Sequence, residues 1–104
     1  APPEAVSGLD IRPESLPDDV AAEARRLWQD GHYRQALSLA YRGALSALVH
    51  HYQVTLTDSA TEGDVLLAAR PRLPRPEGDF LGLLTGLWQR QAYAHQRPDD
   101  ATVL

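Results

Sequence analysis

The apolar positions between residues 31 and 52 recur at the spacing of one face of an α-helix. They are Tyr33, Leu37, Tyr41, Ala44, Leu45, Leu48 and Tyr52, and alanines at positions 36, 40 and 47 widen this face. The positions that stay polar form a narrow ridge of Gln35, Ser38, Arg42, Ser46, His50 and Gln53. A helix that is apolar over most of its circumference is usually the one around which its neighbours pack. We therefore predict a long central helix over residues 31–52.

A second helix is predicted before the central one. It starts near Pro17 and Asp18, because proline suits the first turn and aspartate favours the positive end of the helix dipole. Its apolar positions are Val20, Ala21, Ala24, Leu27 and Trp28. Gly31 is well placed as its C-terminal cap. Because the connection is so short, the two helices should form an antiparallel hairpin.

After the central helix, the pattern predicts an extended crossover and a short third helix. Apolar and polar residues alternate over 53–57, as in a strand-like segment laid over a core. Ser59 and Glu62 have the spacing of a capping box, in which the hydroxyl accepts a backbone N–H and the carboxylate reaches back to the cap. The helix ends near Arg70, since the prolines at 71, 74 and 76 forbid its continuation. Its buried positions are Val65, Leu66 and Ala69.

A fourth helix is predicted to begin around residues 77–79. Its apolar face carries Phe80, Leu83, Leu84, Leu87, Trp88 and Gln91, with Tyr93 closing it. Gly82 and Gly86 lie four residues apart, which would allow another helix to approach closely. Pro98 and two aspartates after it predict the start of a fifth helix. The expected fold is therefore an all-α domain of four helices, or five with the C-terminal one.

Residues 1–17 have the composition of a linker, with four prolines, one glycine and little apolar periodicity. Leu9 and Ile11 alternate with polar neighbours and would suit a short extended piece docked on the helices. The segment is then either docked or a free tether. We predict a Pro-rich linker over residues 1–17 and a helical domain over residues 18–104.

Composition narrows the function classes. A chain of 104 residues with 43% hydrophobic and 23% charged residues fits one small globular domain. The net charge of −4 argues against nucleic acid, which requires a concentrated basic surface. The absence of cysteine excludes disulfides, thiol nucleophiles and thiolate metal sites. No run of residues approaches the length needed to cross a bilayer.

The sequence offers few candidates for catalysis or metal binding. His50 and His51 are adjacent, so on a helix they point about 100° apart and cannot both ligate one ion. Thr61 and Glu62 are explained by the start of a helix. Ser38 shares the polar ridge with His50, yet no acidic residue four positions away completes a triad. We predict neither an enzyme nor a cofactor or metal site.

Two groups of residues are compatible with binding. Arg70, Arg72 and Arg75 cluster in the proline-rich break, where they either contact an acidic lipid surface or are solvated loop charges. The aromatic residues Trp28, Tyr33, Tyr41, Trp88 and Tyr93 are core or groove fillers, and one or two of them could line a surface pocket.

The first helical pair resembles part of a tetratricopeptide repeat. The matching residues are Leu27 and Trp28, then Gly31-His-Tyr33-Arg-Gln-Ala36-Leu37, and then Tyr41 and Ala44-Leu45. In that motif small residues permit close helix packing and aromatics fill the groove between the helices. One such unit is present, whereas a solenoid needs about three, so the resemblance predicts a tetratricopeptide-like hairpin within a different domain.

A second resemblance covers nearly the whole chain and rests on the order of its motifs. Ala36-Leu37-Ser-Leu39-Ala-Tyr41-Arg42-Gly-Ala-Leu45 is followed by Ser59-Ala-Thr61-Glu62, a proline break and Leu87-Trp88-Gln-Arg90-Gln-Ala-Tyr93. This order is similar to that of the bacterial domain-of-unknown-function family 4129. The resemblance implies the soluble C-terminal part of a bacterial inner-membrane protein, on the cytoplasmic side, which residues 1–17 tether to the membrane helices. Other members of the family follow a transglutaminase-like domain, and the family has no established catalytic residues.

These considerations predict a non-catalytic protein-interaction or scaffolding domain. Its partner would be another protein or another domain of the same chain. The predicted partner-binding residues are Gln35, Arg42 and His50, on the exposed ridge of the central helix. The alternative is an accessory or regulatory domain of a membrane-anchored transglutaminase-like or protease-like enzyme.

Overall fold

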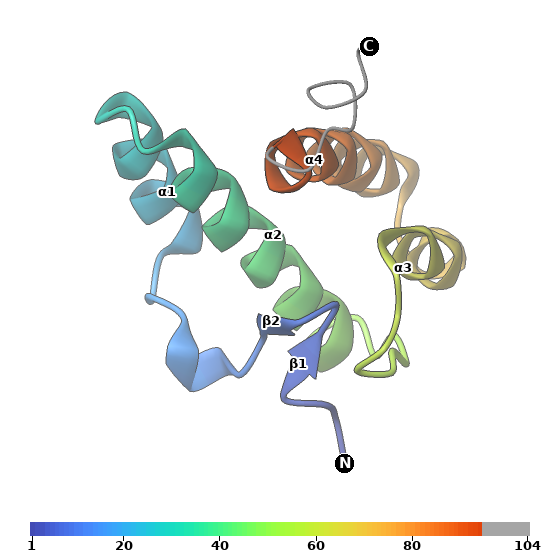
Figure 1. Ribbon diagram of the computed structural model, residues 1–104. Helices are drawn as coiled ribbons and strands as arrows, with labels where there is room; N and C mark the ends of the chain where they lie inside the picture. Colours follow the sequence, from blue (N-terminus) through green and yellow to red (C-terminus); the bar gives the residue numbers. More distant parts are fainter. Residues whose placement is uncertain (95–104) are drawn as a thin grey trace, which may run out of the picture.

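The structure is a computed structural model that describes residues 1–94, in which a short β-hairpin precedes four α-helices (Figure 1). The elements are β1 (Ala5–Val6), β2 (Leu9–Asp10), α1 (Val20–Gln29), α2 (Tyr33–His50), α3 (Glu62–Ala69) and α4 (Arg75–Ala92), with 3-10 turns at Pro13–Ser15 and Arg70–Arg72. The prediction of a small, mostly helical domain is confirmed. The predicted fifth helix lies outside the described residues.

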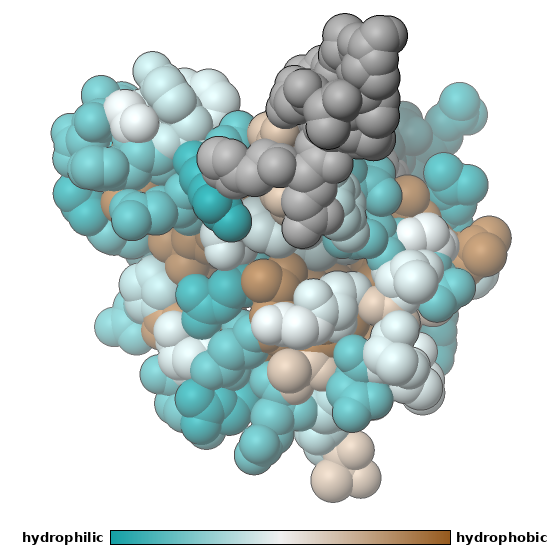
Figure 2. Space-filling view, viewed as in Figure 1, coloured by the Kyte–Doolittle hydropathy of each residue, from teal (hydrophilic) through white to brown (hydrophobic). Residues whose placement is uncertain are grey.

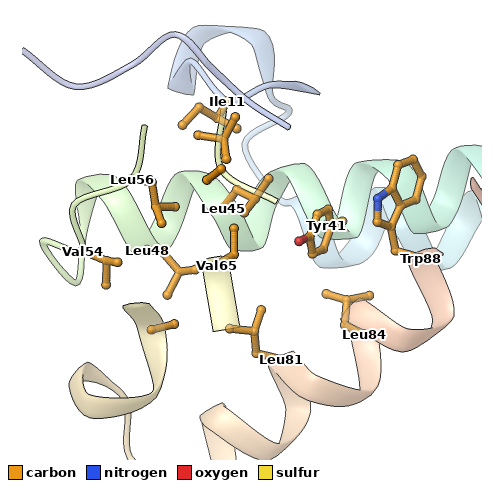
Figure 3. Packing of buried hydrophobic residues seen from close by; sticks show 13 residues of the cluster. Ile11, Tyr41, Leu45, Leu48, Val54, Leu56, Val65, Leu81, Leu84 and Trp88 are labelled. Atoms are coloured by element: carbon orange, nitrogen blue, oxygen red, sulfur yellow. The ribbon is translucent and has the colours of Figure 1, made fainter. Parts of the chain in front are cut away.

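The central position of α2 follows from its broad apolar face. α1 packs on one side of α2, while α3 and α4 lie on the other side (Figure 1). The buried residues that α2 contributes pack against side chains of the N-terminal segment, of residues 54–60, of α3 and of α4 (Figure 3), whereas α1 has no buried residue. The core consists of Val6, Ile11, Tyr41, Leu45, Leu48, Val54, Leu56, Ala60, Val65, Ala69, Leu81, Leu84 and Trp88. The rings of Tyr41 and Trp88 stack with centroids 5.8 Å apart, which joins α2 to α4.

The hairpin of α1 and α2 is defined by its caps and by one glycine. The carboxylate of Asp19 accepts the backbone N–H of Ala22 at 3.0 Å, so α1 begins at Val20, slightly later than predicted. Gly31 adopts φ of +86°, which turns the chain into α2. A Cβ added at Gly43 would lie 2.7 Å from Cγ1 of Val20. α1 therefore lies close to α2 at Gly43, where a larger residue would collide with the Val20 side chain.

The capping box of α3 involves different residues from those predicted. Thr61 Oγ1 accepts the N–H of Asp64 at 3.1 Å, and the Asp64 carboxylate accepts the N–H of Thr61 at 3.0 Å. The hydrogen bond that the Asp64 carboxylate accepts from the Thr61 N–H lowers the pKa of Asp64. The prediction of Ser59 and Glu62 as the pair is wrong, because the same spacing recurs two residues later and Ala60 is buried in the core before the helix begins.

The buried face of α4 is rotated from the predicted one. Leu81, Leu84, Thr85 and Trp88 are buried, whereas Phe80, Leu83 and Leu87 are 62%, 70% and 41% exposed. Thr85 tolerates burial because its hydroxyl donates to the carbonyl of Leu81 at 2.7 Å. Both sets of apolar residues have helical spacing, and α2 and α3 cover only one of them. Gly82 faces no other helix, since a Cβ there would meet no atom within 4 Å.

Residues 5–11 are docked on the helices. Ser7 and Gly8 take φ of 53° and 78° in the hairpin turn, and Val6 and Ile11 are fully buried. The N–H of Ser7 donates to the carbonyl of Asp58 at 3.2 Å, so the hairpin also holds the crossover. Two alternatives were given for residues 1–17, a docked segment and a free tether, and the structure shows a docked segment. Val6, which was not predicted to take part, is buried in the core with Ile11. This part of the predicted linker thus belongs to the core of the helical domain.

The hydroxyl of Tyr41 is an exception within this core. The side chain is fully buried, and its oxygen has no hydrogen-bond partner among the described residues. Burial raises the pKa of Tyr41 to about 12, and the negative charge of Glu62 adds to this effect. The unfolded chain releases the same proton near pH ~10. The contribution of Tyr41 to the free energy of unfolding should therefore not change with pH below pH ~10. Between pH ~10 and pH ~12 the free energy of unfolding should fall, because in this range Tyr41 is ionised only in the unfolded state.

We expect the Tyr41→Phe variant to lose this alkaline decline. At neutral pH its free energy of unfolding should equal that of the parent or exceed it by about 1 kcal/mol, since an unpaired buried hydroxyl is removed. Chemical denaturation at a series of pH values measures both effects. Tyr52→Phe is the control, because Tyr52 is only partly buried and should keep the parent's decline. A clear loss of stability in Tyr41→Phe would show that the hydroxyl has a favourable partner.

Candidate functional site

Two of the three predicted binding residues line one hollow. Gln35 and Arg42 lie in a polar hollow of about 690 Å³ between α1, α2 and the segment that leads into α1. Its lining consists of Ser15, Pro17, Glu23, Leu27, Arg34, Gln35, Ser38, Leu39 and Arg42. His50 is exposed near the opposite end of α2, outside this hollow. The predicted ridge is therefore not one continuous exposed surface, and Ser46, which lies between Arg42 and His50, is buried.

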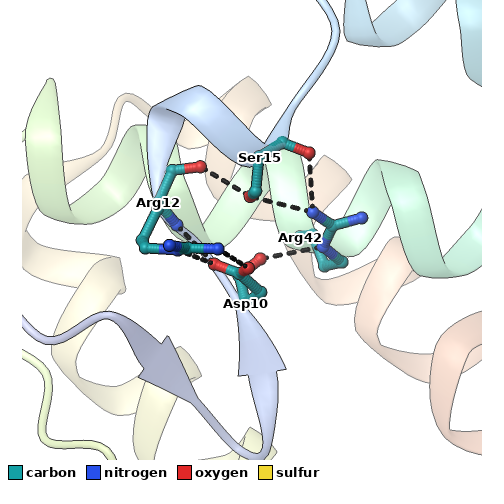
Figure 4. A network of polar contacts seen from close by, with 4 residues as sticks. All are labelled: Asp10, Arg12, Ser15 and Arg42. Atoms are coloured by element: carbon teal, nitrogen blue, oxygen red, sulfur yellow. Dashed lines mark hydrogen bonds and ion pairs between the residues drawn. The ribbon is translucent and has the colours of Figure 1, made fainter.

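Arg42 is bonded to the N-terminal segment (Figure 4). Its Nε donates to the carbonyl of Asp10 at 2.8 Å, and its Nη2 donates to the carbonyl and the hydroxyl oxygen of Ser15 at 3.1 and 3.0 Å. The Ser15 hydroxyl in turn donates to the carbonyl of Arg12 at 2.7 Å. Arg42 thus joins α2 to residues 10–15, a role that its place on a polar ridge did not indicate.

The charges around this bond network are locally paired. The Arg12 guanidinium donates to both oxygens of the Asp10 carboxylate, which holds the pKa of Asp10 well below its usual range. Glu23, the one carboxylate that lines the hollow, is paired with Arg26 at 2.5 Å. Within the described part of its lining, the acidic group is paired and there is no histidine, so this lining supplies no free general base.

An apolar groove lies between α1 and α4, over α2. Its volume is about 420 Å³, and its lining is Val20, Ala21, Ala24, Ala40, Gly43, Ala44, Phe80 and Leu84. The floor comes from the three small residues of α2, while α1 and α4 supply the two walls. On the face of the molecule drawn in Figure 2, hydrophobic residues reach the surface in the middle and hydrophilic ones surround them. Among residues 1–94, no charged side chain lines the groove, which forms an open apolar surface on this part of the chain.

Further apolar side chains extend this surface. The α4 stripe, by which we mean Phe80, Leu83 and Leu87, borders the groove through Phe80. Trp28 and Tyr33 are each about half exposed, and their rings pack edge to face with centroids 4.6 Å apart. Tyr93 is also about half exposed, and none of these three aromatics lines the polar hollow or the apolar groove, whereas Tyr41 and Trp88 are core residues.

The apolar groove was not predicted, although the sequence contains signals for it. Ala40, Gly43 and Ala44 place three small residues on one side of α2, which leaves a depression unless a neighbour fills it. α4 also carries more large apolar residues than one buried face can hold. Their exposure could be recognised only once the positions of α1 and α4 beside α2 were known.

The other described residues considered for catalysis, metal binding or lipid binding lie outside the polar hollow and the apolar groove. Thr61 is engaged in the cap of α3, and Glu62 accepts the hydroxyl of Tyr93 at 3.4 Å. Arg72 donates to the carbonyl of Gln53 at 3.1 Å, while Arg70, Arg75 and Leu83 line a hollow of about 510 Å³. Within residues 1–94 no three histidine, aspartate or glutamate side chains are grouped to hold a metal ion. His95 lies outside the described residues.

No protein-family model, curated protein or solved structure matches this chain. Membership of family 4129 and the tetratricopeptide-like character of the first hairpin therefore stay predictions from the motifs. Of the helices formed by residues 1–94, none combines the length and the apolar character needed to span a bilayer.

Proposed function

We propose that this domain is a non-catalytic protein-interaction module whose apolar groove binds one face of a partner helix. The observation that carries the proposal is the groove itself, with small residues as its floor and the helices α1 and α4 as its walls. Recognition of an amphipathic helix in a groove uses this kind of surface.

The lining indicates what the partner must present. Helices pack with their axes about 8–10 Å apart, and the shorter separations need small residues at the contact. Ala40 and Ala44 meet that need beside Gly43, on which Val20 already packs, so large apolar side chains of a partner could lie against this part of α2. The lining has no charged group, and a charge buried there would lack a counterion. The expected partner face is therefore apolar and uncharged, with large side chains such as leucine or phenylalanine.

The partner is proposed to be another protein or another domain of the same polypeptide. The resemblance to family 4129 supports a place in a bacterial inner-membrane protein, with this domain on the cytoplasmic side. Gln35, Arg42 and His50 do not line the groove. A role for them in binding is a separate prediction, to which the hydrogen bonds of Arg42 with residues 10–15 lend no support.

Site-specific photo-crosslinking in the full-length protein tests the groove. Ala21 and Ala22 are consecutive exposed residues of α1, but only Ala21 lines the groove. A photoreactive phenylalanine analogue at position 21 should give one defined adduct, and the same analogue at position 22 should give little or none. Mass spectrometry of the adduct separates a second protein from a domain of the same chain.

An additional substitution links the adduct to the groove. Ala40→Glu places a carboxylate on the floor and should abolish the adduct from position 21 while the circular dichroism spectrum stays helical. Equal adducts from positions 21 and 22, or none from position 21, would contradict the proposed function.

A further inference from the structure

The outward side of α4 has an apolar surface that nothing in the described chain covers. Phe80, Leu83 and Leu87 are 62%, 70% and 41% exposed, and they recur at helical spacing along the α4 stripe. Single exposed apolar residues are ordinary, but adjoining ones on one helix mark a contact surface. Phe80 also lines the apolar groove, but Leu83, the most exposed of the three, does not, so the outward side of α4 meets the groove wall at Phe80 and is distinct from it at Leu83.

Opposite charges stand at the two ends of this surface. At about 100° per residue, Asp79, Leu83 and Arg90 fall within about 40° of one another around the helix. Asp79 and Arg90 are both exposed, and they lie at equal distances along α4 from the point between Leu84 and Thr85. Arg75 approaches Asp79 only to 4.0 Å, with both side chains largely in solvent, so Asp79 is available to another partner.

This arrangement is complementary to itself under a two-fold rotation. If two α4 helices cross antiparallel about that point, Asp79 of each copy faces Arg90 of the other. Leu83 then faces Gly86, where a Cβ would meet only the far end of the Arg90 side chain at 3.8 Å. A parallel crossing would instead place Asp79 against Asp79 and Arg90 against Arg90. We propose that the outward side of α4 binds a second copy of this chain in an antiparallel, two-fold contact.

The size of α4 sets the expected strength. Its 18 residues span about 27 Å, so one face of it buries less than the ~800 Å² per partner of a standard interface. The dimer should therefore be weak and exchange rapidly. Two copies joined in this way would present two apolar grooves, which goes beyond the function proposed above and does not depend on it.

Sedimentation velocity over a range of concentrations tests the contact with a matched pair of leucines. Leu83 on α4 and Leu67 on α3 are 70% and 72% exposed, so neither substitution disturbs the core. Leu83→Arg should raise the dissociation constant of the dimer at least about tenfold, because it places a charge at the centre of the contact. Leu67→Arg should leave it unchanged. A parent protein that is monomeric throughout, or equal effects of the two variants, would overturn the proposal.

Charge exchange tests the antiparallel geometry. Asp79→Arg and Arg90→Asp should each weaken the dimer about threefold to tenfold, because each creates two like-charge pairs. An equimolar mixture of these two variants should dimerise like the parent, since both pairs again have opposite charges. Absence of this rescue would overturn the two-fold contact. Because adducts from position 21 are measured separately, failure of the dimer and failure of the groove are distinguishable.

Discussion

Replacing Ile11 with alanine is expected to lower the free energy of unfolding by about 3 kcal/mol, within the 2–5 kcal/mol range for buried isoleucine. Ile11 is fully buried and belongs to the same core as Leu45 and Leu56, although the segment around it has the composition of a linker. Truncation to alanine removes buried apolar atoms and leaves a cavity between the β-hairpin and α2 (Figure 3). For a domain of this size the loss is a large part of the total stability.

Chemical denaturation of the full chain measures this effect, with two comparisons. Leu9→Ala, at a half-buried position of β2, should cost clearly less than Ile11→Ala. Pro2→Ala, at an exposed position before the hairpin, should change the stability by less than about 0.5 kcal/mol. If residues 1–17 were only a tether, all three variants would be equally stable.

The helices could be predicted from the sequence because their signals are local. Periodicity over 18 residues is sufficient for α2, and Asp19 and Gly31 mark the ends of α1 through caps that involve near neighbours. The errors arose where two local solutions competed. Two overlapping capping boxes were available before α3, and two apolar sets were available on α4. In each case the choice depended on which side the rest of the chain covers, a property that a single helix does not encode.

The docked hairpin shows the opposite situation. Two buried side chains, Val6 and Ile11, are too few for a periodic signal, and prolines on either side of them suggest a linker. The segment is held by hydrogen bonds to residues that are distant in the sequence. These bonds join it to the carbonyl of Asp58 and to the guanidinium of Arg42. Contacts of this kind are decided by tertiary structure and leave almost no trace in composition.

The candidate sites depended on tertiary structure in the same way. Gln35 and Arg42 are seven residues apart, so their shared side of α2 was predictable, and both line the polar hollow. The apolar groove was not predictable, since its walls belong to α1 and α4, which meet only across α2. The side of α2 that was predicted to bind a partner is partly covered by residues 10–15, and residues 1–94 leave its apolar side open.

Arg42 is where the binding and structural interpretations give different expectations. Arg42→Ala removes three hydrogen bonds from a charged donor, to Asp10 and Ser15, and should lower the free energy of unfolding by about 2 kcal/mol. Arg42→Lys should recover only a part of this loss, because an ammonium group cannot reproduce the forked geometry that reaches two acceptor residues. Arg34→Ala is the control, since Arg34 lines the same hollow but is exposed.

A double-mutant cycle with Ser15→Ala separates the two interpretations of Arg42. If Arg42 stabilises the docked segment, the losses of Arg42→Ala and Ser15→Ala should be non-additive by about 0.5–1 kcal/mol, because Ser15 Oγ accepts from Arg42. Ile11→Ala should also lower the free energy of unfolding by less in the Arg42→Ala background, because the β-hairpin is then already held less firmly. A purely binding role predicts instead that Arg42→Ala leaves the stability unchanged. The photo-crosslink from position 21 should in any case survive Arg42→Ala, because Arg42 does not line the apolar groove and the substitution leaves α1, α2 and α4 in place.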